Sequence, residues 1–263
     1  CKSMHSVKIP ESVKSIGDMA FANSGLKSVV VTKNVISIGV NPFLGCENLC
    51  SIVVDERNSV YDSRENCNAI IETGSNVLIA GCKNSTIPDS VTGFGDKAFY
   101  GTHLSWIEFS DNVRFINNGS FGFCNFRSLV IPSNVEKIAP DAFIGSRELA
   151  SIVVAEDNAV YDSRENCNAL IETATNILVL GCRNTTIPNS VVGIGKNAFY
   201  RSSIRSLIVP NTVESIEMEA FYESEISSIV LPDNITKIGD FAFSYTRLKS
   251  LSVPKGLTDL PCG

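Results

Sequence analysis

Residues 87–99 read IPDSVTGFGDKAF, and nearly the same string, IPNSVVGIGKNAF, stands at residues 187–199. A third version, IPESVKSIGDMAF, occupies residues 9–21. When the apolar residue before Pro10 and its equivalents are used as markers, the steps are 22 or 23 residues, with two steps of 33. The markers are Ile9, Val31, Val54, Ile87, Phe109, Ile131, Val154, Ile187, Val209, Leu231 and Val253. A fixed period of this length predicts a solenoid of stacked coils.

Each coil carries an alternating apolar stretch that is typical of a strand. Leu26-x-x-Val29-x-Val31 is one example, in which one residue faces inward and the next faces outward. Proline follows the marker in most coils and ends the strand, because it has no N–H for the ladder. Eleven parallel strands at a spacing of about 4.8 Å would form a sheet roughly 48 Å long.

Each ordinary coil also has one phenylalanine at the end of an Ala-Phe-like block. The fixed offset of this residue predicts a buried ladder of stacked rings along the solenoid. The spacing of Ile16, Ala20 and Phe21 predicts a short helical turn in the same block. The eight ladder positions are Phe21, Phe43, Phe99, Phe121, Phe143, Phe199, Phe221 and Phe243.

The two 33-residue steps lack this block and share a different segment, residues 60–82 and 160–182, which are nearly identical. In each copy two β-rich runs flank a short linker, Gly74-Ser75 in the first, which predicts a β-hairpin with a two-residue loop. Hairpin-bearing coils are therefore expected at residues 55–86 and 155–186, where the hairpin replaces the helical-turn side of a coil.

The repeated pattern Ile-Pro-x-Ser-Val-x-x-Ile-Gly-x-x-Ala-Phe resembles the BspA-like leucine-rich repeat family over essentially the whole chain. The Tyr-Asp-Ser-Arg-Glu-Asn-Cys segments resemble the form common in gut Bacteroides. The resemblance implies a secreted or surface-anchored bacterial protein, and some members are linked to adhesion to host matrix proteins or to other bacteria. It implies an extracellular or cell-surface location, no catalytic residue and no cofactor.

The predicted fold class is α/β but strand-rich: a single right-handed leucine-rich-repeat solenoid over residues 1–263, with a parallel concave sheet and two inserted β-hairpins. Residues 1–9 align with residues 46–54, so the sequence begins inside a repeat, and Leu257 and Leu260 begin another coil. No polar capping motif is visible at either end. We therefore expect the chain to be a piece of a longer array.

Composition restricts the function further. The formal net charge is −6, which argues against a nucleic-acid partner, because phosphate contacts need a basic footprint. No apolar run approaches the roughly 18 residues that span a bilayer, so no membrane insertion is expected in this segment. The sequence has no initiator Met and no charged-then-apolar leader, so any targeting signal is expected outside it. The two histidines have no sequence neighbours that would make a triad or a metal pair.

Nine cysteines is an odd number, so at least one is unpaired within the chain. A two-residue hairpin loop would place Cys67 opposite Cys82, and Cys167 opposite Cys182. A secreted location would permit two disulfides at these pairs. The alternative is two pairs of packed thiols. Each cysteine pair would occupy a hydrogen-bonded position of its hairpin, on a face directed toward the core. A separate buried row is expected three residues after the ladder Phe, where other coils have Ser or Thr: Cys1, Cys46 and Cys124.

Acidic and amide side chains cluster within residues 55–68 and again within residues 156–168. Oxygen-rich loops can bind calcium, but the alternating Asp/Asn spacing with a hinge glycine is missing, so solvated turns are the preferred interpretation. There is also no Cys-x-x-Cys pair for a structural zinc. No metal site is predicted.

The strand alternation predicts which side chains face outward, namely a row of serines beside an apolar row. Trp106 replaces serine in this row and is expected beside Glu108 and near Val130. An exposed Trp can anchor a partner, and the alternative is a Trp half-buried against the first hairpin. The outward pairs are Ser6/Lys8, Ser28/Val30, Ser51/Val53, Trp106/Glu108, Ser128/Val130, Ser151/Val153, Ser206/Ile208, Ser228/Val230 and Ser250/Ser252.

These observations favour a non-catalytic binding or adhesion module of a bacterial surface protein. Its partner would be a protein or glycan of the host matrix or of other bacteria, recognised through an extended surface. The candidate binding residues are Trp106, Glu108 and Val130. The alternative is a structural spacer, with recognition carried elsewhere in a longer protein. An enzyme would need a deep cleft, which a one-layer solenoid rarely forms.

Overall fold

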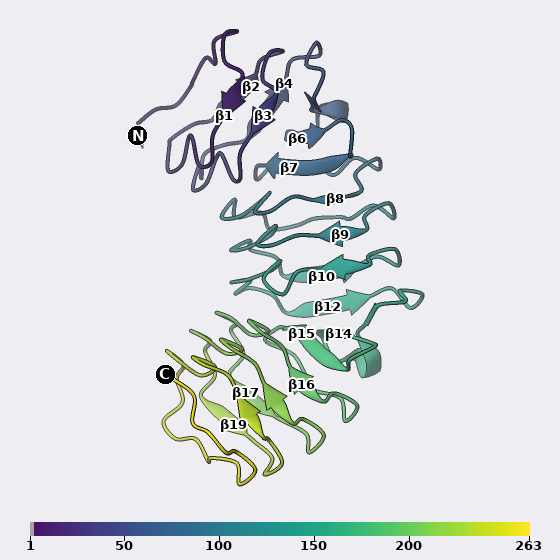
Figure 1. Cartoon of the computed structure of the whole chain (residues 1–263), viewed down its shortest axis with the longest axis vertical. Helices are drawn as coiled ribbons and strands as arrows, with labels where there is room; N and C mark the ends of the chain where they lie inside the picture. The colour runs from purple at the N-terminus through teal and green to yellow at the C-terminus, as the bar shows by residue number, and fades with distance from the viewer. Residues whose placement is uncertain (1–2) are drawn as a thin grey trace. The chain divides into compact units, whose positions relative to one another are not determined.

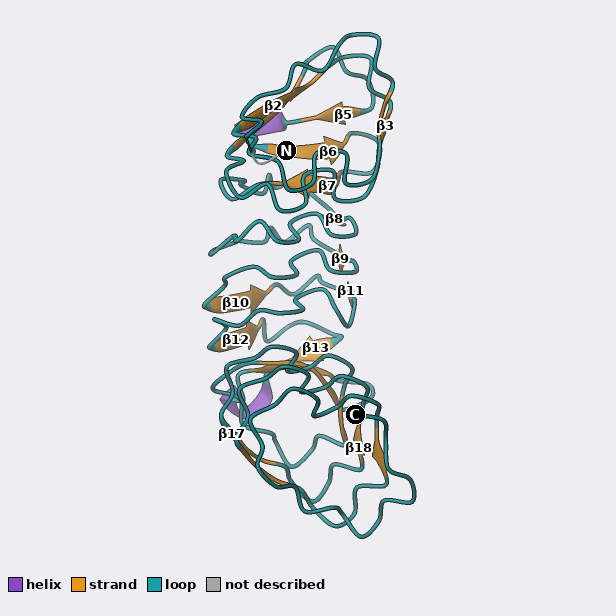
Figure 2. Cartoon of the chain, turned by 90° about the vertical axis from the view of Figure 1, so that its left-hand side faces the viewer, coloured by secondary structure: helices purple, strands orange, loops and turns teal. Residues whose placement is uncertain are grey.

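The structure is a computed structural model that describes residues 3–263. The chain forms two compact units: the first contains the residues up to Cys124 together with Lys137–Ala142, and the second contains Asn125–Glu136 together with Phe143–Gly263. Both units consist of short strands joined by turns, and the described helices are two three-residue 3-10 helices (Figure 2). Neither of them has the length or the apolar character needed to cross a bilayer. The strand-rich part of the predicted fold class is therefore confirmed, whereas almost no helix is present.

The first unit contains three sheets (Figure 1). Strand β2 (Ser28–Val31) pairs in parallel with β4 (Ser51–Val54), and β1 (Ser15–Ile16) pairs in parallel with β3 (Ser37–Ile38). The third sheet has six strands in the order β11-β9-β8-β7-β6-β5, and the 3-10 helix η1 (Arg64–Asn66) joins its edge strand β5 to β6. Its strands are β5 (Tyr61–Asp62), β6 (Ala69–Glu72), β7 (Val77–Gly81), β8 (Gly93–Phe94), β9 (Phe115–Ile116) and β11 (Lys137–Ile138).

The second unit has the same kinds of sheet. Strand β10 (Ser128–Ile131) pairs in parallel with β12 (Ser151–Val154), and β17 (Ser206–Ile208) pairs in parallel with β19 (Ser228–Val230). The 3-10 helix η2 (Arg164–Asn166) again lies next to a six-stranded sheet, with the order β13-β14-β15-β16-β18-β20. Its strands are β13 (Tyr161–Asp162), β14 (Ala169–Glu172), β15 (Ile177–Gly181), β16 (Gly193–Ile194), β18 (Ser215–Ile216) and β20 (Lys237–Ile238).

The continuous parallel sheet of eleven marker strands, which the repeat predicts, does not form. Within residues 3–263 the marker strands pair two at a time, as β2 with β4, β10 with β12 and β17 with β19, and a single parallel bridge joins Ser6 to Ser28 of β2. The register inside each pair is the one expected from the alignment of coils, with Ser28 opposite Ser51. Residues 85–88 and 103–110, which follow the first hairpin, contain no strand, so the marker strands are interrupted there.

The phenylalanine ladder is present within each unit. The central rings are nearly inaccessible to solvent, since Phe99, Phe121, Phe199 and Phe221 are at most 1% exposed. Stacked pairs, with ring centroids 4.9–5.8 Å apart and interplanar angles of 14° or less, are Phe21–Phe43, Phe99–Phe121, Phe199–Phe221 and Phe221–Phe243. Between consecutive ordinary coils, the ring of one coil therefore packs on the ring of the next, as the fixed offset predicts, whereas the hairpin coils have no ladder Phe.

The Ala-Phe block is a pair of tight turns, so the predicted helical turn is wrong. Residues two before and two after the ladder Phe adopt left-handed backbone conformations, as Asn197 (φ 60°) and Arg201 (φ 54°) do around Phe199. The exception is Phe143, where only Gly145 does so. A left-handed residue on both sides ends any right-handed helix. The Phe199 N–H instead donates to the carbonyl oxygen of Ala220 in the next coil, at 2.7 Å.

Strands β6 and β7 form an antiparallel hairpin whose register agrees with the predicted one near the loop, where Ile71 lies opposite Leu78 as expected, and differs from it farther away. The last pair is Glu72 with Val77, so the connection has four residues rather than two. A register shift between Ile70 and Ile71 adds one residue to β7, and Ala69 lies opposite Gly81 instead of Ala80. The shift is a β-bulge, and the copy has the same one.

Both faces of this hairpin are buried, so it separates the core of the coils before it from the core of the coils after it. Residues 69–71 are all fully buried, although successive strand residues point to opposite faces. Ile70 and Ala80 belong to the core of the coils that precede the hairpin. In the copy, Ile171 and Leu178 belong to the core of the coils that follow it. Because the two copies are equivalent, each hairpin gives one apolar face to the core on each side.

Candidate functional site

The outward sides of the paired strands carry the predicted rows of side chains. In β2 the exposure alternates, with Ser28 and Val30 exposed and Val29 and Val31 buried. Strand β10 shows the same alternation. The apolar row is 45–75% exposed and consists of Val30, Val53, Val130, Val153, Ile208 and Val230. They lie side by side only within each strand pair, one pair in the first unit and two in the second, and adjacent exposed apolar side chains of this kind mark candidate interaction surfaces.

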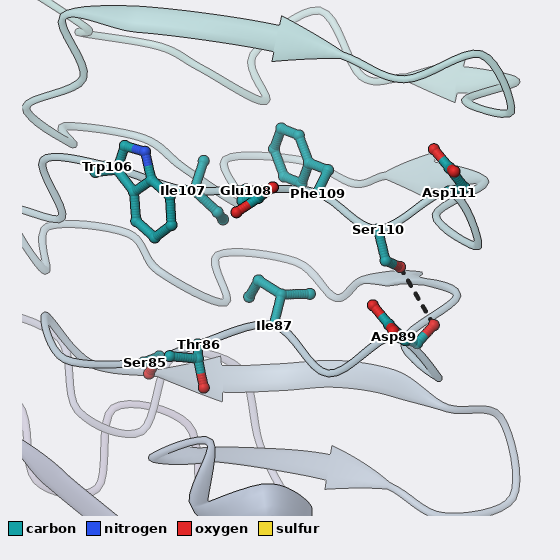
Figure 3. Close-up of a pocket in the computed structure, with 10 residues that line it drawn as sticks. All are labelled: Ser85, Thr86, Ile87, Asp89, Trp106, Ile107, Glu108, Phe109, Ser110 and Asp111. Carbon is teal, nitrogen blue, oxygen red and sulfur yellow. Dashed lines mark hydrogen bonds between the residues drawn. The ribbon is translucent and has the colours of Figure 1, made fainter.

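Trp106 lies at a hollow of about 520 Å³ in the first unit, between residues 85–89 and residues 106–111 (Figure 3). These two segments lack strand pairing, so the hollow occurs where the marker strands are interrupted. The Ser110 hydroxyl donates to the backbone oxygen of Asp89 at 3.3 Å and joins the two segments. The Trp106 side chain is 63% exposed, so of the two alternatives for this residue the structure shows the exposed one.

The Trp106 hollow combines an indole ring with negative charge. Glu108 is exposed two residues from Trp106, and Asp89 and Asp111 also line the hollow. Phe109 is only 9% exposed and contributes an apolar side. An accessible indole near carboxylates suits the side chain of a Lys or Arg residue, because the ring face and the carboxylates both attract a cation.

Val130, the third candidate residue, belongs to the second unit. It lies in β10 with Val153 as its Cα partner in β12, and it is 61% exposed. The structure thus brings Trp106 and Glu108 together at one hollow and places Val130 in the row of exposed apolar side chains.

A second hollow, of about 680 Å³, occurs 100 residues later in the second unit. It lies at the equivalent place after the second hairpin, but Ser206 and Ile208 stand where the first copy has Trp106 and Glu108. The repeat architecture therefore creates the hollow, whereas its chemistry differs between the copies. The fold itself requires neither the indole nor the carboxylate.

The hairpin cysteines are packed thiols in the structure. All four are buried and free, and the register shift removes the predicted opposition of Cys67 and Cys82. The Sγ atoms of Cys67 and Cys82 donate to backbone oxygens at 3.8 Å and 3.4 Å. Burial raises the pKa of Cys67 to about 11, and it also raises the pKa of Cys82, Cys167 and Cys182. Of the two alternatives, the structure corresponds to packed thiols.

The row three residues after the ladder Phe is buried, as predicted. Cys46 is 7% exposed, and its Sγ lies 3.2 Å from the hydroxyl of Ser24 and donates to the backbone oxygen of Phe21 at 3.1 Å. Cys124 is 1% exposed, and burial raises its pKa to about 12. Cys1, which is expected in the same row, lies outside the described residues. The thiols of Cys46 and Cys124 and the hydroxyls of Thr102 and Ser146 donate to backbone oxygens of ladder phenylalanines.

The oxygen-rich loops divide into solvated and buried groups. Asp55 is a turn residue whose carboxylate bonds Arg57 at 2.8 Å, as expected for a solvated turn. The same interpretation is wrong for Asn58 and Asn158, which are 8% exposed and hydrogen-bonded to the coil before them. No group of three or more His, Cys, Asp or Glu side chains within residues 3–263 is arranged to hold a metal ion.

A cluster of arginines in the second unit was not expected from the sequence. Arg147 and Arg205 line a polar hollow of about 670 Å³ together with Glu225. A position-by-position comparison of the two 100-residue copies could have found it, because Glu47 and Ser105 stand at the equivalent positions of the first copy. The net charge of −6 hides this local excess of positive charge.

Residues 1–73, 79–175 and 180–261 match, in six copies, a family model described as BspA type Leucine rich repeat region. The chain is similar to the solved structure of a leucine-rich repeat protein from Eubacterium ventriosum, with 21% identity and a TM-score of 0.65 over 93% of this chain. It spans 65% of that protein's chain.

It is also similar to a leucine rich cell surface protein from Faecalibacterium prausnitzii, with 25% identity and a TM-score of 0.65, over 94% of this chain and 72% of the other. None of the curated proteins matches the chain. The family match and the two solved structures agree with the observed stack of strand-rich coils.

Proposed function

The chain belongs to the BspA-type leucine-rich repeat family, and from this premise we propose that it is a non-catalytic binding module for another protein. Solenoid repeats present extended surfaces, so affinity comes from a row of contacts along several coils rather than from one deep pocket. The exposed apolar row and the Trp106 hollow are the parts of the surface that support this function.

The observation that carries the proposal is the exposure of Trp106, which is 63% accessible at the edge of a hollow. Other coils carry serine at this position, so the solenoid does not need an indole there. Exposing an indole to water is unfavourable in free energy, and Trp is enriched among the interface residues that dominate binding energy. With Glu108 and Asp89 nearby, the hollow suits a partner segment that presents a basic side chain.

In this proposal the module acts at a bacterial cell surface, in adhesion to host matrix proteins or to other bacteria. The Faecalibacterium prausnitzii relative is described as a cell surface protein, which supports the location. The right-handed winding and the concave strand side expected from the sequence belong to the same proposal, because curved solenoids bind extended partners on that side.

The test measures binding of the purified chain to immobilised host matrix proteins and to surface proteins of other bacteria. Trp106→Ser installs the residue that the other coils carry, and we expect it to weaken binding at least about tenfold. The control is Ser206→Ala, at the equivalent position of the second copy, which should leave binding unchanged. Circular dichroism of both variants should match the parent. Undiminished binding by Trp106→Ser would remove this surface from the proposal.

A structural spacer is the second candidate, and the regular stacking of ladder rings favours it. A spacer needs stiffness and length, which the packed coils supply without any exposed anchor. It predicts that no protein in the panel binds and that Trp106→Ser changes nothing. The same experiment therefore separates the two functions.

A further inference from the structure

Loops of the second unit bring several guanidinium groups around one carboxylate. Arg147, Arg183 and Arg205 line a polar hollow of about 670 Å³ with Glu148 and Glu225. The three arginines come from three successive coils, so the cluster exists only because the coils stack. Of the five charged side chains, only Arg147 and Glu148 are neighbours in sequence, and Arg183, Arg205 and Glu225 each come from a different coil.

Glu225 holds the cluster together. Its side chain is only 14% exposed, and a carboxylate oxygen accepts a hydrogen bond from Arg147. Arg205 Nε lies 3.8 Å and Arg247 Nη2 lies 3.5 Å from the same carboxylate. The hydrogen bond from Arg147 is the largest of the effects that lower the pKa of Glu225, so the carboxylate stays charged and continues to attract the guanidiniums at neutral pH.

Backbone contacts fix the loops that carry these side chains. The Ser203 hydroxyl donates to the backbone oxygen of Arg147 at 2.9 Å. The backbone N–H of Arg183 donates to the oxygen of Leu149 at 3.2 Å, and Asn184 Nδ2 donates to the oxygen of Ala150 at 3.0 Å. The site is therefore largely pre-formed, which lowers the entropic cost of binding.

One carboxylate cannot neutralise all of these groups. Four arginines, at 147, 183, 205 and 247, face two glutamates, at 148 and 225, so two positive charges remain. Within residues 3–263 the Arg183 side chain has no ion-pair partner, and the side chains of Arg147, Arg205 and Arg247 are 60–79% exposed. A basic hollow on a chain of net charge −6 is a local feature and not a consequence of composition.

The first copy shows that the fold does not require the cluster. The positions 100 residues before Arg147, Arg205 and Glu225 hold Glu47, Ser105 and Asn125. Arg183 corresponds to Lys83, the one basic residue that both copies share among these positions. The arginines thus distinguish two otherwise nearly identical hairpin repeats, as expected for residues that act on a ligand rather than on packing.

We propose that this arginine cluster binds the sulfate or carboxylate groups of an acidic polysaccharide. Guanidinium groups form forked, charge-assisted hydrogen bonds to sulfate and carboxylate oxygens. Asn184, Ser203 and Ser206 lie in the same hollow and offer polar groups for sugar hydroxyls. A nucleic acid would need a basic footprint longer than one hollow on an acidic chain. The site is separate from the Trp106 hollow and does not depend on it.

The test measures binding of the whole chain to heparin, which carries sulfates and carboxylates, and to hyaluronate, which carries carboxylates alone. Arg205→Ser removes one guanidinium and leaves the Arg147–Glu225 bond, and we expect about a fivefold loss of affinity. The triple variant Arg147→Glu, Arg205→Ser, Glu225→Asn restores the first copy's residues, and we expect a loss of at least about thirtyfold. Binding of heparin alone assigns sulfate, and binding of both probes assigns the shared anionic charge.

Lys255→Ser is the matched control, because it also removes one exposed positive charge from the second unit. It should change heparin affinity less than about twofold. Trp106→Ser should also leave heparin binding unchanged, which separates this site from the protein-binding proposal. If the triple variant unfolds, as measured by circular dichroism, Arg205→Ser decides the question. Absence of binding to both glycans, full binding by Arg205→Ser, or tighter binding to polyuridylate would overturn the proposal.

Discussion

The ring of Phe99 packs so closely on Gly81 that a Cβ on that glycine would lie 2.1 Å from the ring carbon Cε1. The second copy repeats the relationship, with 2.0 Å between the corresponding atoms of Gly181 and Phe199. The Gly81 N–H also donates to the oxygen of Ala98 at 2.9 Å. The last residue of β7, Gly81, therefore contacts Phe99, the first ladder ring after the hairpin, at a position where no side chain fits.

Gly81→Ala should destabilise the protein by about 1–3 kcal/mol, because the buried Phe99 ring has no free space to move into. The measurement is the free energy of unfolding from urea titrations. Gly74→Ala is the control, since a Cβ there meets nothing within 4 Å and the second copy already has Ala174. Equal effects of the two substitutions would contradict this account of the packing.

Asn58→Leu should cost at least about 3 kcal/mol, because it removes four hydrogen bonds to the backbone, two of them buried, at the Val35 oxygen and the Tyr61 N–H. Asn58 Nδ2 donates to the oxygens of Thr32 and Val35, and its Oδ1 accepts from the N–H groups of Val60 and Tyr61, all at 2.9 Å. The measurement is again chemical unfolding.

Asn34→Ala serves as the comparison for Asn58→Leu. Asn34 makes one exposed hydrogen bond, to the oxygen of Glu11 at 2.8 Å, so its loss should stay below about 1 kcal/mol. A cost for Asn58→Leu no larger than this would show that the amide does not secure the first hairpin coil to the coil before it.

Repeat, strand alternation and ring ladder could all be predicted, because each depends on a period that the sequence displays directly. The turn geometry could not be predicted from apolar spacing alone. Ile16, Ala20 and Phe21 fit a helical spacing, but Asn23 adopts a left-handed conformation that a helix does not tolerate. The recurrence of Asn and Gly beside the ladder positions was the missed signal.

The hairpin register and the arginine cluster could not be predicted from the sequence either, because both depend on contacts between segments that are distant in the chain. The bulge in β7 depends on how both faces of the hairpin pack, and no local pattern specifies it. The arginine cluster requires loops from separate coils to meet at Glu225. By contrast, the outward position of Trp106 could be predicted from strand alternation, but the sequence left open whether its side chain is exposed or half-buried against the first hairpin.

Arg64→Lys should loosen the hairpin loop. The Arg64 guanidinium donates to Asp62, to the amide oxygen of Asn76 at 2.8 Å and to the hydroxyl of Ser90 at 3.1 Å, so it joins three segments. A lysine cannot reproduce the fork, and we expect a loss of about 1–2 kcal/mol with faster hydrogen exchange at residues 73–76. Arg57→Lys, at an exposed pair, should show neither effect.

Titration of the denatured, non-reduced chain with a thiol reagent should find nine thiols. The structure has free cysteines at every described position, and the register shift removes the geometry that would pair Cys67 with Cys82. Two hairpin disulfides would consume four cysteines and leave five. In the native state the exposed Cys262 should react first, and the buried thiols should react slowly, because burial keeps them protonated.

Stability should fall at alkaline pH because of the buried thiols. Burial raises the pKa of Cys124 from 9.0 to about 12 and that of Cys67 to about 11, so the folded state holds these protons more tightly than the unfolded state does. Their contribution is fully present below pH 9 and is lost as the pH rises toward 11 and 12. Cys124→Ser, the residue type found at Ser24, should flatten the fall in unfolding free energy above pH 9, whereas Cys262→Ser should not. A parallel pH dependence in all three proteins would contradict the assignment.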